Sequence, residues 1–300
     1  MPGGAMVEKI DELLVGIRPQ KEWGILVIIY LFLGGGGAGL YAVSLYMDRV
    51  FEAVLGLVTV AAGALFLLLD LGHPERFWRA FMRPGTSWIS RGTFFITLLL
   101  AAGTLHIAPS IPGMEFLPWG KGAMIGGILK GVAGLLAVMV MTYTGFVLSP
   151  SPAIPFWNSP LVPAVFLSYS LLAGVDLFLL IERTLGLGGE NLPFLERFQG
   201  QLTLVCLALV VLHIGVMSAR TVAARQTVRM LTRGPYAVLF VGGVLLAGLV
   251  APLLLTGKLI LDRNTDIAVH TLVLAGVMRL SGDYLFRYLM VRTGCYDSIL

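Results

Sequence analysis

Charge and cysteine are scarce in this sequence. Only 13% of its 300 residues are Asp, Glu, Lys or Arg, whereas an average soluble domain has about 25%. The two cysteines, Cys206 and Cys295, do not form a Cys-x-x-Cys pair. Because an iron–sulfur cluster needs about four cysteine ligands, we expect no cluster within this chain, and a disulfide framework is excluded as well.

Histidine is scarce too, which bears on haem binding. The four histidines are His73, His106, His213 and His270. A haem held by two histidines needs a facing pair at one membrane depth, and only His106 and His270 are expected near the same membrane face. We therefore expect structural or proton-relay roles and neither haem nor a metal site, with a haem b anchor kept as an alternative.

Long apolar runs dominate what is present. Eight stretches are apolar for about 20 residues each, the length that crosses a hydrocarbon core of about 30 Å as helix. We predict an all-α integral membrane protein with eight transmembrane helices, arranged as two four-helix-bundle-like halves. Residues 1–22 are interpreted as an amphipathic lead-in and residues 23–300 as one transmembrane domain. The stretches are 24–46, 50–69, 92–108, 123–148, 160–181, 201–219, 237–256 and 267–290.

The distribution of positive charge predicts the orientation. An even number of spans puts both termini on one side, and that side collects most of the lysine and arginine residues. Cytoplasmic loops carry such an excess, so we place the protein in the cytoplasmic membrane of a prokaryote, with both termini in the cytoplasm. A face that docks an acidic partner would also concentrate arginine there.

The first predicted helix contains a glycine run, GGGGAG at 34–39. The run matches the dinucleotide fingerprint G-x-G-x-x-G, but that motif needs a preceding strand and a following soluble helix, and here it lies inside a membrane span. We interpret it as a small-residue face against a neighbouring helix. The missing side chains around Gly36 are also expected to leave space for a flat ligand.

Among the ionisable residues within predicted spans, Asp176, Arg279 and Asp283 are the candidates for a functional role. A charged side chain there costs about 2.5–3.5 kcal/mol on insertion scales. Arg279 and Asp283 are four residues apart and are expected to pair on one helix. They form either a structural ion pair or, together with Asp176, His213 and Lys130, part of a proton path.

Two tyrosines point to a ligand site at the predicted cytoplasmic side. Tyr143 and Thr144 lie about one turn inside the end of the fourth span, and Tyr30 lies two turns into the first. A tyrosine hydroxyl donates to a quinone carbonyl while its ring packs on the quinone face. These residues therefore predict a quinone site, and the alternative is an ordinary belt of interfacial tyrosines.

Three loops on the same side, 70–91, 149–160 and 220–234, combine tryptophan, proline and arginine. Asp70 and His73 are expected at the mouth of the quinone site, where a histidine titrates near neutral pH; for Asp70 the alternative is a helix cap or a partner of Arg76. We interpret the loops as a docking surface for a partner subunit, with the candidate contacts Arg76, Trp78, Arg83, Trp157, Asn158 and Arg225.

Four segments taken together resemble a known family. The stretches YTGFVLS at 143–149 and PFWN at 155–158, with DLGHPERFW at 70–78 and SWISRG at 87–92, are similar to the NrfD-like family of membrane subunits of the polysulfide reductase type. The likeness covers at least residues 23–180, and the count of eight spans extends it to the whole chain.

The resemblance implies a membrane anchor that binds quinone or quinol, either menaquinone or ubiquinone, and itself holds neither haem nor an iron–sulfur cluster. It also implies as partners a four-cluster ferredoxin-like iron–sulfur subunit and a molybdopterin catalytic subunit, besides membrane lipids, and no nucleic acid. The family's quinone-site tyrosine corresponds to Tyr143, whereas its polar pair on the first helix falls at Tyr30 and Val27 here and is not preserved. The rival interpretation is an ion-translocating subunit or secondary transporter without quinone.

Overall fold

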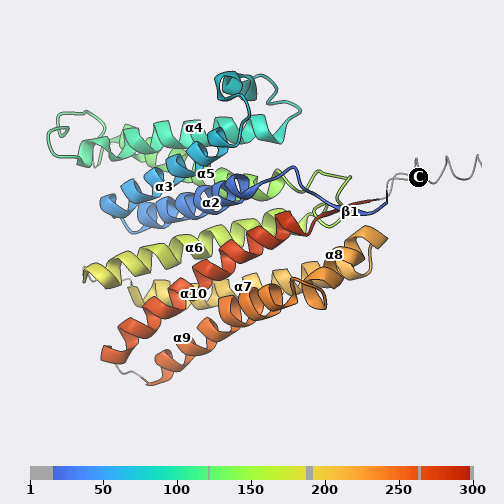
Figure 1. Ribbon diagram of the computed structural model, residues 1–300. Helices are drawn as coiled ribbons and strands as arrows, with labels where there is room; N and C mark the ends of the chain where they lie inside the picture. The colour runs from blue at the N-terminus through green and yellow to red at the C-terminus, as the bar shows by residue number, and fades with distance from the viewer. Residues whose placement is uncertain (1–15, 121, 187–191, 263–264, 298–300) are drawn as a thin grey trace, which may run out of the picture.

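The computed structural model describes residues 16–297 except 121, 187–191 and 263–264, and for 258–262 and 265–268 it describes the backbone alone. Long helices lie side by side along a common direction and form one bundle (Figure 1). In chain order the elements are β1 (Arg18–Pro19), α2 (Ile25–Tyr46), α3 (Val50–Leu69), the 3-10 helix η1 (Pro74–Phe81), α4 (Trp88–Ile107), the 3-10 helix η2 (Ala108–Ser110), α5 (Met124–Phe146), α6 (Leu161–Leu185), α7 (Leu192–Ser218), α8 (Val222–Thr232), the π-helix η3 (Val238–Val250), α9 (Ala251–Asp262), α10 (Thr265–Arg292) and β2 (Cys295–Tyr296).

Within the described residues, seven helical segments are long and apolar enough to cross a membrane: α2, α3, α4 with η2, α5, α6, α7, and η3 running into α9. The expected integral membrane architecture is thus confirmed for seven of the eight predicted spans. The eighth, α10, forms a 28-residue helix of about 42 Å that packs on α2, α6 and η3. Arg279, Asp283 and Arg287 lie within it, and it is not among these seven segments.

Two helices begin earlier than their apolar runs. Helix α4 starts at Trp88 because the Ser87 side chain accepts a hydrogen bond from the backbone N–H of Ser90, as an N-cap serine does. Helix α7 starts at Leu192 rather than near residue 201, since one of its faces, including Leu195 and Gln199, stays buried in the bundle. These two helices therefore include polar residues that lie outside the boundaries predicted from the apolar runs alone.

The glycine run of α2 forms the predicted small-residue face. A Cβ atom at Gly39 would come within 2.1 Å of the Ser170 carbonyl oxygen on α6, and one at Gly37 within 2.8 Å of the Val60 nitrogen on α3. Backbones approach this closely only where side chains are absent. The glycines thus place α2 between α3 and α6 at the centre of the bundle.

The described segments next to the two termini lie together at one end of the bundle, on the right in Figure 1. Strand β1 pairs antiparallel with β2, with Arg18 opposite Tyr296. The buried Gln20 side chain donates to the Val291 carbonyl at 2.8 Å, and the Tyr296 hydroxyl donates to Glu22 Oε2 at 2.8 Å. Residues 1–15 of the expected lead-in lie outside the described residues, and the part that follows is a strand fixed to the C-terminal segment.

Candidate functional site

The structure brings Tyr30 and Tyr143 together in the interior, near the end of the bundle that carries β1. Tyr30 is in the second turn of α2 and Tyr143 in the last turn of α5, and each is only 2% exposed. Their hydroxyl groups are close enough to interact, yet within the described part of the chain the Tyr30 hydroxyl has no hydrogen-bond partner of proper geometry. A buried hydroxyl without a partner is costly and is open to a ligand.

Close packing fixes the position of Tyr143. Its ring lies directly on Gly92 of α4, where a Cβ atom would come within 1.9 Å of the Tyr143 Cζ atom. One turn away, Trp88 stacks on Phe146 with ring centroids 4.4 Å apart. Gly145 permits contact with α6, since a Cβ there would lie 2.5 Å from Pro163 Cα. The YTG and SRG motifs thus meet in space and build the tyrosine site together.

The other predicted quinone ligands are not gathered around the tyrosines. The buried Thr144 hydroxyl donates to the Met141 carbonyl of its own helix at 2.6 Å. Gly36 faces Ala173 of α6, whose Cβ would lie 3.5 Å from a Cβ at Gly36, so the expected space for a flat ligand beside it is filled. Asp70 is exposed at the C-cap of α3, and the exposed His73 lies with Nδ1 3.0 Å from Glu75 Oε1.

Two buried ion pairs cross the interior, and their partners differ from the prediction. Arg279 pairs with Asp176 of α6, Nε to Oδ1 at 2.8 Å, whereas Asp283 pairs with Arg287 at 2.8 Å. The expected pair of Arg279 with Asp283 is therefore wrong. Arg287 is the better partner for Asp283 because its fork also donates to the Leu31 carbonyl at 2.8 Å and to the Ser170 hydroxyl at 3.1 Å. An aspartate that precedes its arginine by four residues is also the favoured order on a helix.

The remaining members of the expected proton path lie elsewhere. Lys130 forms an ion pair with Asp48 at the opposite end of α5, about 20 Å along the helix from Tyr143. His213 is buried against Phe156, with ring centroids 4.9 Å apart. Neither residue contacts the pair of Asp176 and Arg279, so the five residues do not form one group.

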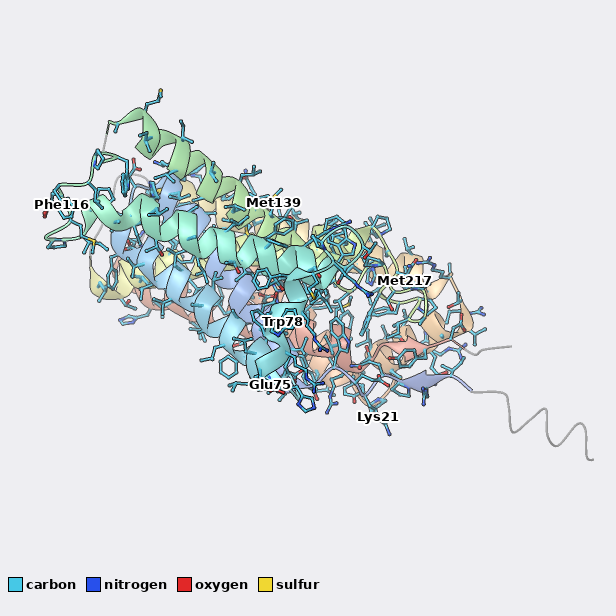
Figure 2. The ribbon with its side chains drawn as sticks, turned by 90° about the horizontal axis from the view of Figure 1, so that it is seen from above. Lys21, Glu75, Trp78, Phe116, Met139 and Met217 are labelled. Atoms are coloured by element: carbon cyan, nitrogen blue, oxygen red, sulfur yellow. The ribbon has the colours of Figure 1, made fainter. Side chains whose placement is uncertain are left out.

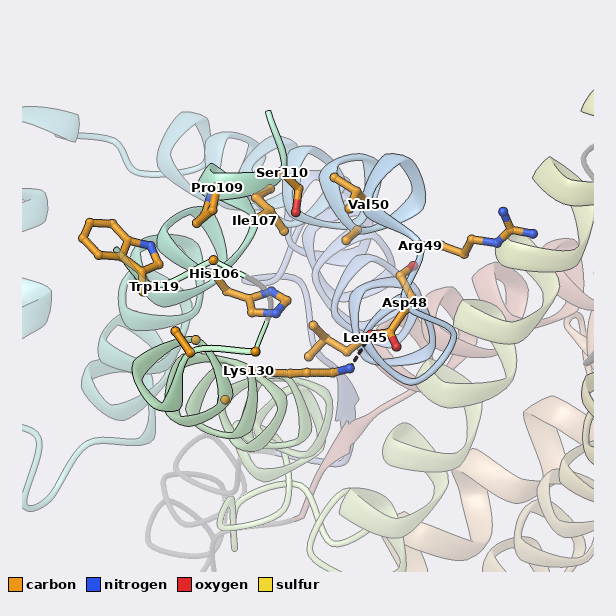
Figure 3. A pocket seen from close by; sticks show the side chains of 17 residues that line it. Leu45, Asp48, Arg49, Val50, His106, Ile107, Pro109, Ser110, Trp119 and Lys130 are labelled. Carbon is orange, nitrogen blue, oxygen red and sulfur yellow. Dashed lines mark hydrogen bonds and ion pairs between the residues drawn. The ribbon is translucent and has the colours of Figure 1, made fainter. Parts of the chain in front are cut away.

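A cavity of about 510 Å³ lies at the end of the bundle opposite the tyrosines (Figure 3). The His106 ring points into it, and the ion pair of Lys130 with Asp48 closes one side. Arg49 at its edge also pairs with the buried Glu182, Nε to Oε1 at 3.1 Å. We expected the ligand pocket beside the tyrosines, and this cavity was missed because its walls combine the ends of four helices with loop residues, an arrangement that leaves no pattern in the sequence.

The expected docking residues divide into a surface group and a structural group. Arg76, Trp78, Arg83 and Arg225 are exposed, and Figure 2 shows Trp78 and Glu75 toward the end that carries Lys21, with Phe116 at the other end. Trp157 is 2% exposed, and its indole donates to the Met290 carbonyl at 2.6 Å. Asn158 accepts a hydrogen bond from Arg220 at 3.1 Å. Trp157 is therefore a core residue, and its assignment to docking is wrong.

Some interior polar residues were not anticipated from the sequence. Arg287 was not singled out, although its position four residues after Asp283 was a usable signal. Gln199, which donates to Asp176, fell outside the predicted sixth span. Glu52 and Glu182, each 1% exposed, were also missed because they lie at the ends of apolar runs.

Comparison with known proteins matches this chain to membrane subunits of reductases. The family described as "Polysulphide reductase, NrfD" matches residues 15–296. A polysulfide reductase chain of Wolinella succinogenes is 28% identical over 86% of this chain and 91% of its own length. Protein NrfD of Escherichia coli is 27% identical over 78% of this chain and 83% of its own. A selenate reductase subunit of Mesobacillus selenatarsenatis is 27% identical over 58% of this chain and 51% of its own.

Proposed function

Since this chain belongs to the NrfD family, as its motifs predict, we propose that it is the quinone-binding membrane subunit of a multi-subunit oxidoreductase. Membership of a family of multi-pass membrane subunits of reductases supports this role. The chain exchanges electrons between a quinone, either menaquinone or ubiquinone, and an iron–sulfur partner. Its two cysteines are both free and buried, so the electron carrier has to lie in another polypeptide.

The facing hydroxyls of Tyr30 and Tyr143 carry the proposal. In a dry interior a hydroxyl seeks a hydrogen-bond partner, and that of Tyr30 has none among the described residues. A quinone carbonyl supplies the missing acceptor. Quinone enters between α2, α4 and α5 from the lipid, and the two tyrosines hold and orient its polar edge.

The exposed arginine and tryptophan residues at the same end support a docking surface for the partner. Arg76, Trp78, Arg83 and Arg225 remain the proposed contacts, with the exposed Asp70 and His73 beside them. The proposed partners are a four-cluster ferredoxin-like iron–sulfur subunit and a molybdopterin catalytic subunit. Electron transfer requires a cluster close to the quinone, and this end is the nearest surface to the tyrosines.

We further propose that α10 is an eighth span, because Arg279, Asp283 and Arg287 pair inside the bundle rather than facing lipid. Interior pairing is how ionisable residues are tolerated in membrane helices. Eight spans place both termini on one side, and the arginine-rich loops make that side cytoplasmic.

The test uses the purified complex with Tyr30→Phe and Tyr143→Phe variants. We expect quinol-coupled turnover to fall about 10- to 100-fold, the effect of losing one or two buried hydrogen bonds to a ligand, while the complex still assembles. Tyr46→Phe is the matched control, because Tyr46 lies on the same helix but is 70% exposed. Unchanged turnover in Tyr143→Phe, with loss in His106→Ala, would move the quinone to the opposite cavity and refute the assignment.

A quinone-independent ion-translocating subunit is the second candidate function, and the buried ion pairs favour it. Purification distinguishes the two. A quinone-linked anchor is isolated together with iron–sulfur and molybdenum subunits and with bound quinone, whereas a transporter is isolated alone. A Soret band in the purified protein would instead indicate a haem b anchor.

A further inference from the structure

Several polar atoms around the pair of Asp176 and Arg279 have no hydrogen-bond partner in the part of the chain that the structure describes. Among the described residues, Asp176 Oδ2, Gln199 Oε1 and both Nη atoms of Arg279 make no hydrogen bond. All three side chains are at most 2% exposed. In a membrane interior each such group costs several kcal/mol unless it is satisfied. Buried waters meet such groups in proteins and typically make about three hydrogen bonds each.

A gap of the right size lies next to these atoms. Its volume is about 10 Å³, and its walls include Asp176, Gln199, Gly276, Arg183 and Glu196. About one probe sphere of free volume holds one water molecule. The carboxylate, amide and guanidinium groups around the gap supply more than the two polar partners that a buried water needs.

On one side the gap reaches the surface. Arg183, near the end of α6, pairs with Glu196 in the second turn of α7. Their side chains are 28% and 21% exposed, so the pair stands between the interior and the end of the bundle opposite the tyrosines. Lys130 and its partner Asp48 lie at this end too, but on the separate cavity between α2, α3, α4 and α5.

On the other side polar groups continue toward the tyrosines. Asp283 lies one helical turn from Arg279 on α10, and its Oδ2 atom lacks a partner in the described structure. Its own partner, Arg287, donates to the carbonyl of Leu31 at 2.8 Å, and Leu31 follows Tyr30 in the chain. Polar side chains therefore occur at successive depths from the tyrosines to Glu196.

We propose that the gap between Asp176, Gln199 and Glu196 binds an ordered water, and that this water relays protons between the quinone site and the opposite membrane face. Glu196 exchanges the proton at the surface, Asp176 passes it inside the bundle, and Gln199 positions the water. The relay rests on the proposed function, because reducing one quinone to quinol consumes two electrons and two protons. The iron–sulfur partner delivers the electrons, and the relay delivers the protons from the far side.

The experiment uses the whole complex in proteoliposomes with a pH indicator trapped in the lumen. A membrane-impermeant reduced viologen, added outside the vesicles, donates electrons only to complexes whose partner subunits face outward. A short-chain quinone accepts the electrons. Quinone reduction and lumenal pH are recorded together. We expect the lumen to become alkaline as the quinone is reduced, because the protons come from the side opposite the partner.

The variants locate the relay. In Glu196→Gln and Gln199→Leu we expect the alkalinisation rate to fall about 100-fold, the lower range for loss of a positioned proton-transfer group, and Glu196→Asp to restore most of it. Gln201→Leu is the matched control, since Gln201 is exposed on the same helix. An unchanged alkalinisation rate in both test variants overturns the relay. A lower rate in Glu52→Gln together with an unchanged rate in Glu196→Gln also overturns it.

The two proposals fail in different ways. A wild-type complex that reduces no quinone refutes the proposed function, whereas one that reduces quinone without alkalinising the lumen refutes the relay alone. A high-resolution cryo-EM map gives a readout independent of activity. It should show density for a water between Asp176 and Glu196 in the wild type and none in Gln199→Leu, and an empty gap in the wild type would overturn the site.

Discussion

The ring of Tyr143 occupies the space that a side chain on Gly92 would need, since a Cβ at residue 92 would come within 1.9 Å of its Cζ atom. Gly92→Ala therefore has to displace the ring or separate α4 from α5. We expect quinol-coupled turnover to fall about as far as in Tyr143→Phe, with a loss of about 1–3 kcal/mol in stability from overpacking. Turnover and thermal unfolding of the purified complex measure the two effects.

Gly131→Ala is the control for that substitution. Gly131 is exposed on α5, the helix that carries Tyr143, and a Cβ there would meet nothing within 4 Å. We expect normal turnover and stability in this variant. If Gly92→Ala also has normal turnover, then the position of the Tyr143 ring does not matter for quinone chemistry.

Removing one partner of the buried ion pair between Asp176 and Arg279 should lower the stability of the protein much more than removing both. Asp176→Asn leaves the Arg279 guanidinium uncompensated, and breaking such a pair costs about 3–5 kcal/mol. The double variant Asp176→Asn with Arg279→Gln removes both charges and should regain much of that stability. Unfolding of all three variants in detergent gives the coupling energy, and strictly additive losses would show that the two side chains do not interact energetically.

Lengths of apolar runs were sufficient to predict most helices, because backbone hydrogen bonding in a membrane leaves few alternatives to a helix. They could not predict which charges pair. Asp176 and Arg279 are 103 residues apart, and their contact depends on how α6 and α10 are rotated against each other. The tyrosine site was predictable in part, since Tyr30 and Tyr143 lie at matching depths. The contact of Gly92 with Tyr143 could be recognised only in the packed structure, because a glycine has no side chain that would mark it in the sequence as part of a site.

The contact of Glu22 with Tyr296 makes the joined terminal segments sensitive to acid. The Tyr296 hydroxyl bond is the main cause that lowers the pKa of Glu22 below its ordinary value of 4.5. A carboxyl group with a lowered pKa in the folded state stabilises that state above its unfolded pKa, and the stabilisation is lost as the pH falls through the folded pKa. We therefore expect β1 and β2 to separate more easily once the pH falls below 4.5.

The predicted acid sensitivity is tested by amide hydrogen exchange in β1 and β2, with the wild type and Tyr296→Phe compared at the same pH. Wild type should exchange more slowly than Tyr296→Phe at about pH 7, and the difference should be smaller at about pH 3, because Glu22 loses its charge as the pH falls through its lowered pKa. A difference of equal size at both values would mean that the hydrogen bond contributes independently of the charge.

The same substitution should affect different properties at Trp157 and Trp78: the stability of the protein at Trp157, and the retention of partner subunits at Trp78. Trp157→Phe leaves the buried Met290 carbonyl without its donor, at a cost of about 1–3 kcal/mol. It also loses part of the contact with Trp23, whose ring centroid lies 5.4 Å away. Trp78 is 57% exposed, so Trp78→Phe should leave the stability of the protein unchanged and weaken retention of the partner subunits. Thermal unfolding of the protein and the yield of co-purified iron–sulfur subunit separate the two effects, and a stable complex in Trp78→Phe together with a dissociated one in Trp157→Phe would reverse the assignment.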